Sequence, residues 1–216
     1  MAVESGYRPG RRAVTARFCD ELPFGFGWIV DEPRLLQRAS HALADDRRVW
    51  LVDPVDVAGL DDRIRALGRP AGVVQLIDRH GRDAAVLAER YGVPLSRHPF
   101  AGVPGAPFQV LRVVDLPRWH EAALWWPESK TLVVADALGT ASYFVGPGER
   151  LAVHPLLRLF PPRSLGRFDP QHVLCGHGPG VHGAEATQAL HAALRTSRRG
   201  IPRWLAGLVR QRGRGT

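Results

Sequence analysis

Apolar residues in the first half of the chain change from one spacing to another in a regular order. Compact apolar runs over residues 49–54 and 71–77 predict buried strands. Each run is followed by an amphipathic stretch that ends at a glycine, first Gly68 and then Gly92, as helices commonly do. This β-α-β-α alternation with short connections predicts layers of sheet and helix rather than a helical bundle.

The flanking parts of the chain carry further elements of both kinds. Before this unit, the patterns predict strands over residues 13–18 and 24–30 and a helix over residues 33–43. After residue 107, β-rich runs broken by proline, glycine or charged turns predict strands over 108–114, 122–127, 131–136 and 172–176. The remaining patterns predict a long crossing segment over 146–170, a helix over 183–197 and a last helix over 201–211, opened by Pro202.

Length and composition suit one soluble domain. The chain has 216 residues, of which 45% are apolar, enough for a sizeable core. No apolar run is long enough to cross a membrane, and the first residues lack the apolar region of a secretory signal. Cys19 and Cys175 are the only cysteines, which argues against a disulfide scaffold. We therefore expect a cytoplasmic protein.

Positive charge is concentrated at the C-terminus. The net charge is +8, yet no acidic residue follows Glu185, and seven arginines lie beyond that point. We interpret residues 1–196 as the folded domain and residues 197–216 as a basic, arginine-rich tail with a helix at its start. Such a tail binds nucleic acid or an anionic membrane surface in some proteins. It is equally well explained as a solvated tail in an arginine-preferring organism, since Lys130 is the only lysine.

Four segments, in order, resemble the metallo-β-lactamase superfamily of hydrolases. "VWLVDP" resembles the early strand that ends in an aspartate, and "VVQLIDRHGRDAAVLAERYGVPL" resembles the strand, metal loop and helix that carry the H-x-H-x-D-H signature. "AALWWPESKTLVVADAL" resembles the strands that deliver a bridging aspartate, and "HVLCGHGPG" the loop with the last histidine ligand. The resemblance implies an α/β fold, a four-layer αββα sandwich with the site along one edge of its two sheets.

The resemblance also implies a metal site, with a degenerate motif. Aligned on the signature, "DRHGRD" places Asp78, His80, Arg82 and Asp83 at the four ligand positions. His80 matches, Asp78 and Asp83 are chemically possible ligands, and Arg82 cannot ligate a cation. The late motifs add two more expected ligands, Asp136 and His177. The metal set implied by the resemblance is therefore His80, Asp136 and His177, with Asp78 and Asp83 as further candidates.

Charge suggests a role for the arginine. Without metal ions, clustered carboxylates would repel one another, and a guanidinium offers a fixed set of donors to a carboxylate. We therefore expect Arg82 to pair with Asp136 or Asp83, to stand in for a lost ion, and to take part with Asp136 in any catalysis. Arg82, His120 and Trp119 are the candidate residues for a substrate or anion.

Plainer interpretations stay open for the same residues. Asp78 and Asp83 suit a helix N-terminus, where carboxylates satisfy free N–H groups. His177, between Gly176 and Gly178, suits a tight turn around a core histidine. Trp119 and His120 are also ordinary sheet residues, and Cys175 is read as a buried strand residue.

Two functions follow for comparison. The first is a hydrolase-fold protein whose metal centre has eroded, without dinuclear zinc chemistry, that binds a small-molecule ligand through Arg82. The alternative is a hydrolase with one divalent metal, zinc by preference, acting on an ester, thioester, lactone or phosphoester. The cofactor expectation is accordingly no metal or a single ion. Nucleic-acid binding through the tail is a minor third function.

Overall fold

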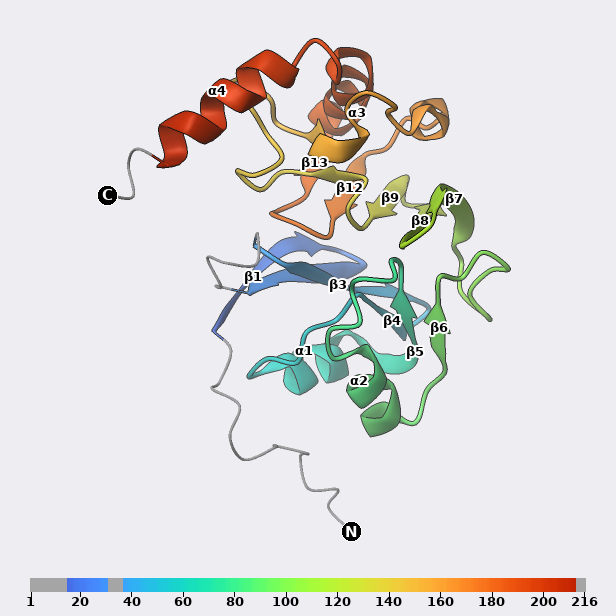
Figure 1. The fold of residues 1–216 in the computed structure, drawn as a ribbon. Helices are drawn as coiled ribbons and strands as arrows, with labels where there is room; N and C mark the ends of the chain where they lie inside the picture. Colours follow the sequence, from blue (N-terminus) through green and yellow to red (C-terminus); the bar gives the residue numbers. More distant parts are fainter. Residues whose placement is uncertain (1–14, 31–36, 213–216) are drawn as a thin grey trace.

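The computed structural model describes residues 15–30 and 37–212 (Figure 1). Its layers run from helices α1 (Leu60–Leu67) and α2 (Ala84–Tyr91), through two facing sheets, to helix α3 (Ala184–Thr196) on the opposite side. Both α1 and α2 contact strand β5 (Arg69–Gln75), whereas α3 contacts strand β12 (His172–Cys175). The predicted α/β class and αββα sandwich are therefore confirmed.

Within the described residues, the first sheet has the order β1-β2-β3-β4-β5-β6. Its remaining strands are β1 (Ala16–Leu22), β2 (Gly25–Val30), β3 (Ala39–Asp45), β4 (Arg48–Val52) and β6 (Leu95–Arg97). The strands β1 to β4 pair antiparallel, and β4, β5 and β6 pair parallel. The parallel pairs are the ones joined by the predicted β-α-β-α unit, so the carboxyl ends of β4 and β5 lie at one edge.

The second sheet has the order β13-β12-β9-β8-β7 in the described part of the chain. Its other strands are β7 (Gln109–Leu116), β8 (Trp119–Trp126), β9 (Thr131–Val134) and β13 (Val181–His182). All pairs are antiparallel except β9 with β12, which run parallel and therefore end at the same edge. The strands predicted over 108–114, 122–127, 131–136 and 172–176 correspond to β7, β8, β9 and β12.

The helix predicted over residues 33–43 is wrong. Residues 31–36 lie outside the described ranges, and Ala39–Asp45 form strand β3, paired with β2 and with β4. Every residue of β3 from Ala39 to Leu43 is buried. Alanine and leucine form helices readily in isolation, but a central strand between two partners satisfies its backbone groups on both sides and overrides that preference.

Residues 146–170 form the predicted crossing segment. It contains only short elements, namely β11 (Ala152–Val153) paired with β10 (Leu138–Gly139), and two 3-10 turns, η2 (Pro155–Leu157) and η3 (Arg163–Arg167). After α3, helix α4 (Ile201–Arg212) begins with Pro202 as its second residue, as predicted. The Trp204 indole in α4 donates to the Tyr143 carbonyl at 2.7 Å. None of the helices in the described ranges is long and apolar enough to span a membrane.

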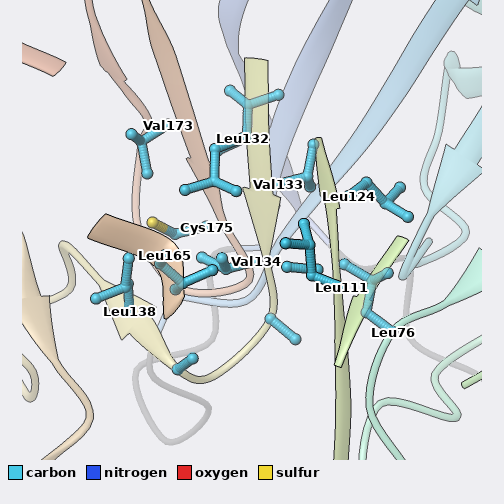
Figure 2. Packing of buried hydrophobic residues seen from close by; sticks show 14 of the residues in the cluster. Leu76, Leu111, Leu124, Leu132, Val133, Val134, Leu138, Leu165, Val173 and Cys175 are labelled. Atoms are coloured by element: carbon cyan, nitrogen blue, oxygen red, sulfur yellow. The ribbon is translucent and has the colours of Figure 1, made fainter. Parts of the chain in front are cut away.

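Apolar side chains fill the space between the two sheets and beneath α3. Figure 2 shows this packing, with Leu76, which directly follows β5 of the first sheet, and with Leu111, Leu124 and Val133 of the second sheet. A second cluster, which includes Leu60, lies between the first sheet and helices α1 and α2. These two cores hold the sheet edge rigid, and the polar site described next is built on that edge.

Candidate metal centre

Loops that follow parallel strands bring the polar residues of the site together. Asp53 follows β4, His80 follows β5, Asp136 follows β9 and His177 follows β12. Backbone hydrogen bonds join the loops across the two sheets, among them Ala39 N–H to the Gly176 carbonyl at 2.8 Å. The site therefore forms only because the two sheets pack face to face, and no single element provides it.

His80, Asp136 and His177 direct one atom each toward a common point. The Asp136 Oδ1 atom lies 3.0 Å from His80 Nε2 and 3.1 Å from His177 Nε2, and the two nitrogens lie 3.3 Å apart. All three residues are buried. Burial alone would raise the pKa of Asp136, but the contacts with His177 and His80 hold that pKa far below its ordinary value. Asp136 is therefore a carboxylate at any physiological pH.

Asp53 fixes the orientation of His80. Its Oδ2 lies 2.9 Å from His80 Nδ1, and its Oδ1 accepts the Leu76 backbone N–H at 2.8 Å. The acceptor on Nδ1 favours the tautomer that carries its proton there, and that tautomer would present the Nε2 lone pair to a metal ion at the common point. Burial and Arg82 act to lower the pKa of His80, but Asp53 and Asp136 outweigh them, so that pKa is raised.

Glycines on both sides of His177 allow the loop to hold its ring. Gly178 has φ 84°, and a Cβ at that position would lie 2.3 Å from Thr140 Oγ1. A Cβ at Gly176 would lie 2.8 Å from the Ala135 carbonyl oxygen. The imidazole stacks on Phe144 with a centroid separation of 5.5 Å. The close backbone approach therefore requires glycine, and it leaves His177 facing Asp136.

Arg79 lies at the exposed side of the group. Its guanidinium bonds Asp136 Oδ2 at 2.9 Å and lies 4.2 Å from the centre of the Trp119 ring. With 42% of its side chain exposed, it keeps donors directed to solvent. The Trp119 indole donates to Glu121, which is fully buried and also accepts the backbone N–H groups on either side of Asp136. Burial and Asp136 raise the pKa of Glu121 to about 7.

Comparisons with known proteins agree with this architecture. A crystal structure of DIM-1 metallo-β-lactamase exposed to ceftazidime superposes with a TM-score of 0.56 at 13% identity, covering 87% of this chain and all of that chain. A second crystal structure of DIM-1 metallo-β-lactamase gives 0.56 at 14% identity, covering 85% and 95%. The chain has the metallo-β-lactamase fold. No protein-family model and no curated protein matches it in sequence.

The three convergent residues of this metallo-β-lactamase fold fit one metal ion. Tetrahedral zinc at about 2.0–2.1 Å from its ligands places neighbouring ligand atoms about 3.3 Å apart, close to the separations among His80, Asp136 and His177. Asp136 Oδ1 is buried and lacks a hydrogen bond of acceptable geometry to any described group, despite the two nitrogens nearby. Two imidazoles and a carboxylate are the three protein ligands of one kind of catalytic zinc site.

Arg82 does not occupy the place expected for it. The guanidinium is directed into the fold, where it donates to the carbonyl oxygens of Asp53 at 2.8 Å, Gly176 at 3.1 Å and Ala39. The expected ion pair with Asp136 or Asp83 is therefore wrong, and the arginine bound to Asp136 is Arg79. The reason is the direction of the side chain: from a backbone with φ 37°, the Arg82 guanidinium extends to the carbonyl oxygens of Ala39, Asp53 and Gly176.

A cation nevertheless lies beside the ligand group. Arg82 Nη2 is 3.5 Å from His80 Nε2. Burial lowers the pKa of Arg82 to about 10, so the guanidinium is charged at neutral pH. A positive charge therefore lies at the position where the resemblance implies an aspartate ligand.

The other sequence candidates lie around the group and not in it. Asp78 Oδ2 accepts the His120 backbone N–H at 3.2 Å, and Asp83 Oδ2 accepts the Asp56 backbone N–H at 3.0 Å. Asp83 occupies the N-cap position of α2, but its side chain makes no capping hydrogen bond. The His120 ring lies 2.7 Å from the exposed carboxylate of Asp115. The plainer helix-terminus interpretation therefore describes the position of Asp83 but not what its carboxylate does.

Asp53 and Arg79 are residues that sequence reasoning did not place in the site, whereas the sequence leaves Glu121 as an alternative to His120 for facing it. For Asp53 a signal was present, because "VWLVDP" resembles the early strand that ends in an aspartate, although no role was assigned to it. Arg79 carried no comparable signal, since its contact arises only where the loop after β5 meets the end of β9.

Proposed function

We propose that this protein is a mononuclear metal-dependent hydrolase. The observation that carries the proposal is the convergence of His80, Asp136 and His177 on one point at separations suited to a single ion. Such an ion, when bound, supplies a Lewis acid and lowers the pKa of a bound water. Asp53 supports the centre by holding the His80 Nε2 lone pair toward it.

Arg79 is the residue best placed to recognise a substrate. It is exposed at the side of Asp136, and Trp119 supports the guanidinium from below. A guanidinium in this position can bind a carboxylate or phosphate oxygen on the substrate. It can also stabilise the negative charge that develops as an ester, thioester, lactone or phosphoester is cleaved. The proposal moves the anion-binding role from Arg82, whose two terminal nitrogens donate to backbone carbonyls.

Metal analysis of protein purified without a histidine tag is the first test. We expect one zinc or similar ion per chain, lost in His80→Ala and His177→Ala, together with a rise in melting temperature when zinc is added, because a ligand that binds only the folded state stabilises it. A chain without metal and without a thermal shift would contradict the proposal.

Activity is tested with chromogenic esters, thioesters, lactones and phosphodiesters. We expect Arg79→Gln to lower kcat/KM for anionic substrates by about 10- to 100-fold, the usual effect of losing a charged hydrogen bond, and to leave neutral substrates nearly unaffected. Equal losses on anionic and neutral substrates would contradict the recognition role of Arg79 but not the proposed metal centre.

A second candidate is a metal-free protein that binds a small ligand at the same site. The observation that favours it is Arg82, whose positive charge lies 3.5 Å from His80 Nε2 and opposes a cation there. This function predicts no bound metal, no hydrolysis of any of the four substrate classes, and a thermal shift with anionic ligands that depends on Arg79.

A further inference from the structure

An open cavity lies between η3 and the C-terminal half of α3. Helix α3 lies at the end of the molecule far from α1 and α2 (Figure 1). Its volume is about 630 Å³. The lining is basic, and its residues are Arg163, Gly166, His191, Leu194, Arg195, Arg198 and Arg199. None of them belongs to the candidate metal centre, and neither hydrolysis nor metal binding gives them a role.

The four arginines of this cavity carry charge that the protein does not neutralise. Across residues 15–30 and 37–212, no ion pair with a carboxylate involves any of them. No acidic residue of the described ranges is in the lining, and the exposed carboxylate of Asp169, outside it, lies 3.6 Å from the His191 ring. All four arginines are exposed, and together their guanidinium groups concentrate positive charge around one cavity, which attracts anions.

An apolar ridge borders the cavity. Leu156, Leu159 and Phe160 are 73%, 56% and 77% exposed, which is unusual for three large apolar side chains in one short segment. Consecutive 3-10 turns place Leu156 and Leu159 three residues apart, on one side of the segment. Arg198 joins ridge and cavity, since its Nε donates to the Leu159 carbonyl at 2.6 Å and its guanidinium lies 5.9 Å from the Phe160 ring.

From this juxtaposition we propose that the face formed by the ridge and the cavity binds the surface of a membrane that contains anionic phospholipids. Guanidinium groups bind phosphate oxygens in pairs of hydrogen bonds, so the cavity receives lipid headgroups. The exposed leucines and Phe160 enter the boundary between headgroups and acyl chains, where apolar side chains gain burial and arginines keep their charge in water. The association is peripheral.

The aliphatic part of the ridge distinguishes a membrane from other polyanions. Single-stranded nucleic acid gains stacking from Phe160 and charge neutralisation from the arginines, but it offers nothing apolar to Leu156 and Leu159. A free phosphate compound would fill the cavity and leave the whole ridge in water. A lipid interface with anionic headgroups uses both halves of this face.

Flotation of the purified full-length chain with lipid vesicles tests the proposal. We expect binding to phosphatidylcholine vesicles doped with phosphatidylglycerol, weak binding to pure phosphatidylcholine, and a decrease as salt is raised. Each arginine near an anionic surface strengthens binding by about fivefold, so Arg195→Gln/Arg199→Gln should weaken it roughly 30-fold. Phe160→Ser, which removes apolar burial, should weaken it roughly tenfold.

Matched variants exclude a general effect of charge or apolarity. Arg97→Gln/Arg118→Gln removes the same charge from exposed positions elsewhere, and Leu116→Ser removes a side chain that is 53% exposed on β7. Both should bind vesicles within twofold of the unmodified chain, with all variants melting at its temperature. Equal losses in the matched variants would overturn the proposal. So would tighter binding to a single-stranded oligonucleotide than to vesicles, or binding of pyrophosphate without any binding to vesicles.

Discussion

Asp53→Asn is the sharpest perturbation of the candidate metal centre, because it changes one atom of a fully buried side chain. In the native arrangement the carboxylate accepts two hydrogen bonds, from Leu76 N–H and from His80 Nδ1. An asparagine has one acceptor and one donor end, so it can satisfy only one of these groups. With its oxygen on Leu76, its NH₂ faces Nδ1 and forces the imidazole proton onto Nε2, the atom aimed at the metal position.

The magnitude follows from the role of such contacts. Removing the carboxylate that orients a metal-bound histidine typically lowers metal affinity 10- to 100-fold, which corresponds to about 1.4–2.7 kcal/mol. We therefore expect the zinc Kd of Asp53→Asn to rise by that factor, measured by competition with a chromophoric chelator. His80→Ala, which removes the ligand itself, should abolish the binding.

The chain offers a closely matched control. The Asp20 side chain is also buried, and its Oδ1 contacts one backbone N–H, that of Gly180 at 2.9 Å, and one imidazole, that of His182 at 3.0 Å, whereas Asp53 uses a different oxygen for each contact. Asp20→Asn therefore repeats the chemical change away from the centre and should leave the zinc Kd within twofold. If both variants bind zinc like the unmodified chain, while His80→Ala does not, the assigned tautomer of His80 is wrong.

Three further predictions concern stability. Arg158 is 1% exposed and bonds both oxygens of Glu149, at 3.1 and 2.7 Å. Arg158→Met should lower the free energy of unfolding in urea by about 3–5 kcal/mol. Arg158→Met/Glu149→Leu should recover part of that loss. Arg82→Met leaves three backbone carbonyls without their donor and should cost roughly 3 kcal/mol; an unchanged melting temperature would contradict this. Burial lowers the pKa of His154 to about 4, so on acidification the unfolded chain takes up this proton before the folded chain does. The stability present above pH 6.5 is therefore lost as pH falls toward 4. His154→Asn should flatten the dependence of melting temperature on pH over that range, relative to the unmodified chain.

Elements with a strong local pattern were predictable from the sequence. The apolar runs of β4 and β5, the amphipathic spacing of α1 and the glycine at the end of α2 each report a local rule, and Gly92 does adopt the left-handed conformation, with φ 63°. Strand β3 was not predictable in this way. Its helix-like spacing is overridden by pairing with β2 and β4, which lie on either side of it in the sheet.

Part of the site was predictable because its residues follow strand ends in a fixed order. The structure brings His80, Asp136 and His177 together from three separate motifs, as the resemblance implies. The arginines could not be assigned in the same way. Arg79 and Arg82 flank the same histidine, and which of them meets Asp136 depends on the direction the backbone takes at Arg82, where φ is positive.

The two oxygens of Asp136 explain why the proposed centre takes one ion and not two. The common way for a carboxylate to bridge two metals uses one oxygen for each ion. Here Oδ1 faces the two histidines, whereas Oδ2 is bound to Arg79 at 2.9 Å. On the other side of the group, Arg82 brings its charge to 3.5 Å from His80 Nε2. A second cation would have to displace one guanidinium from the carboxylate and approach another, so the arrangement favours a single ion, with Arg79 left to meet the substrate.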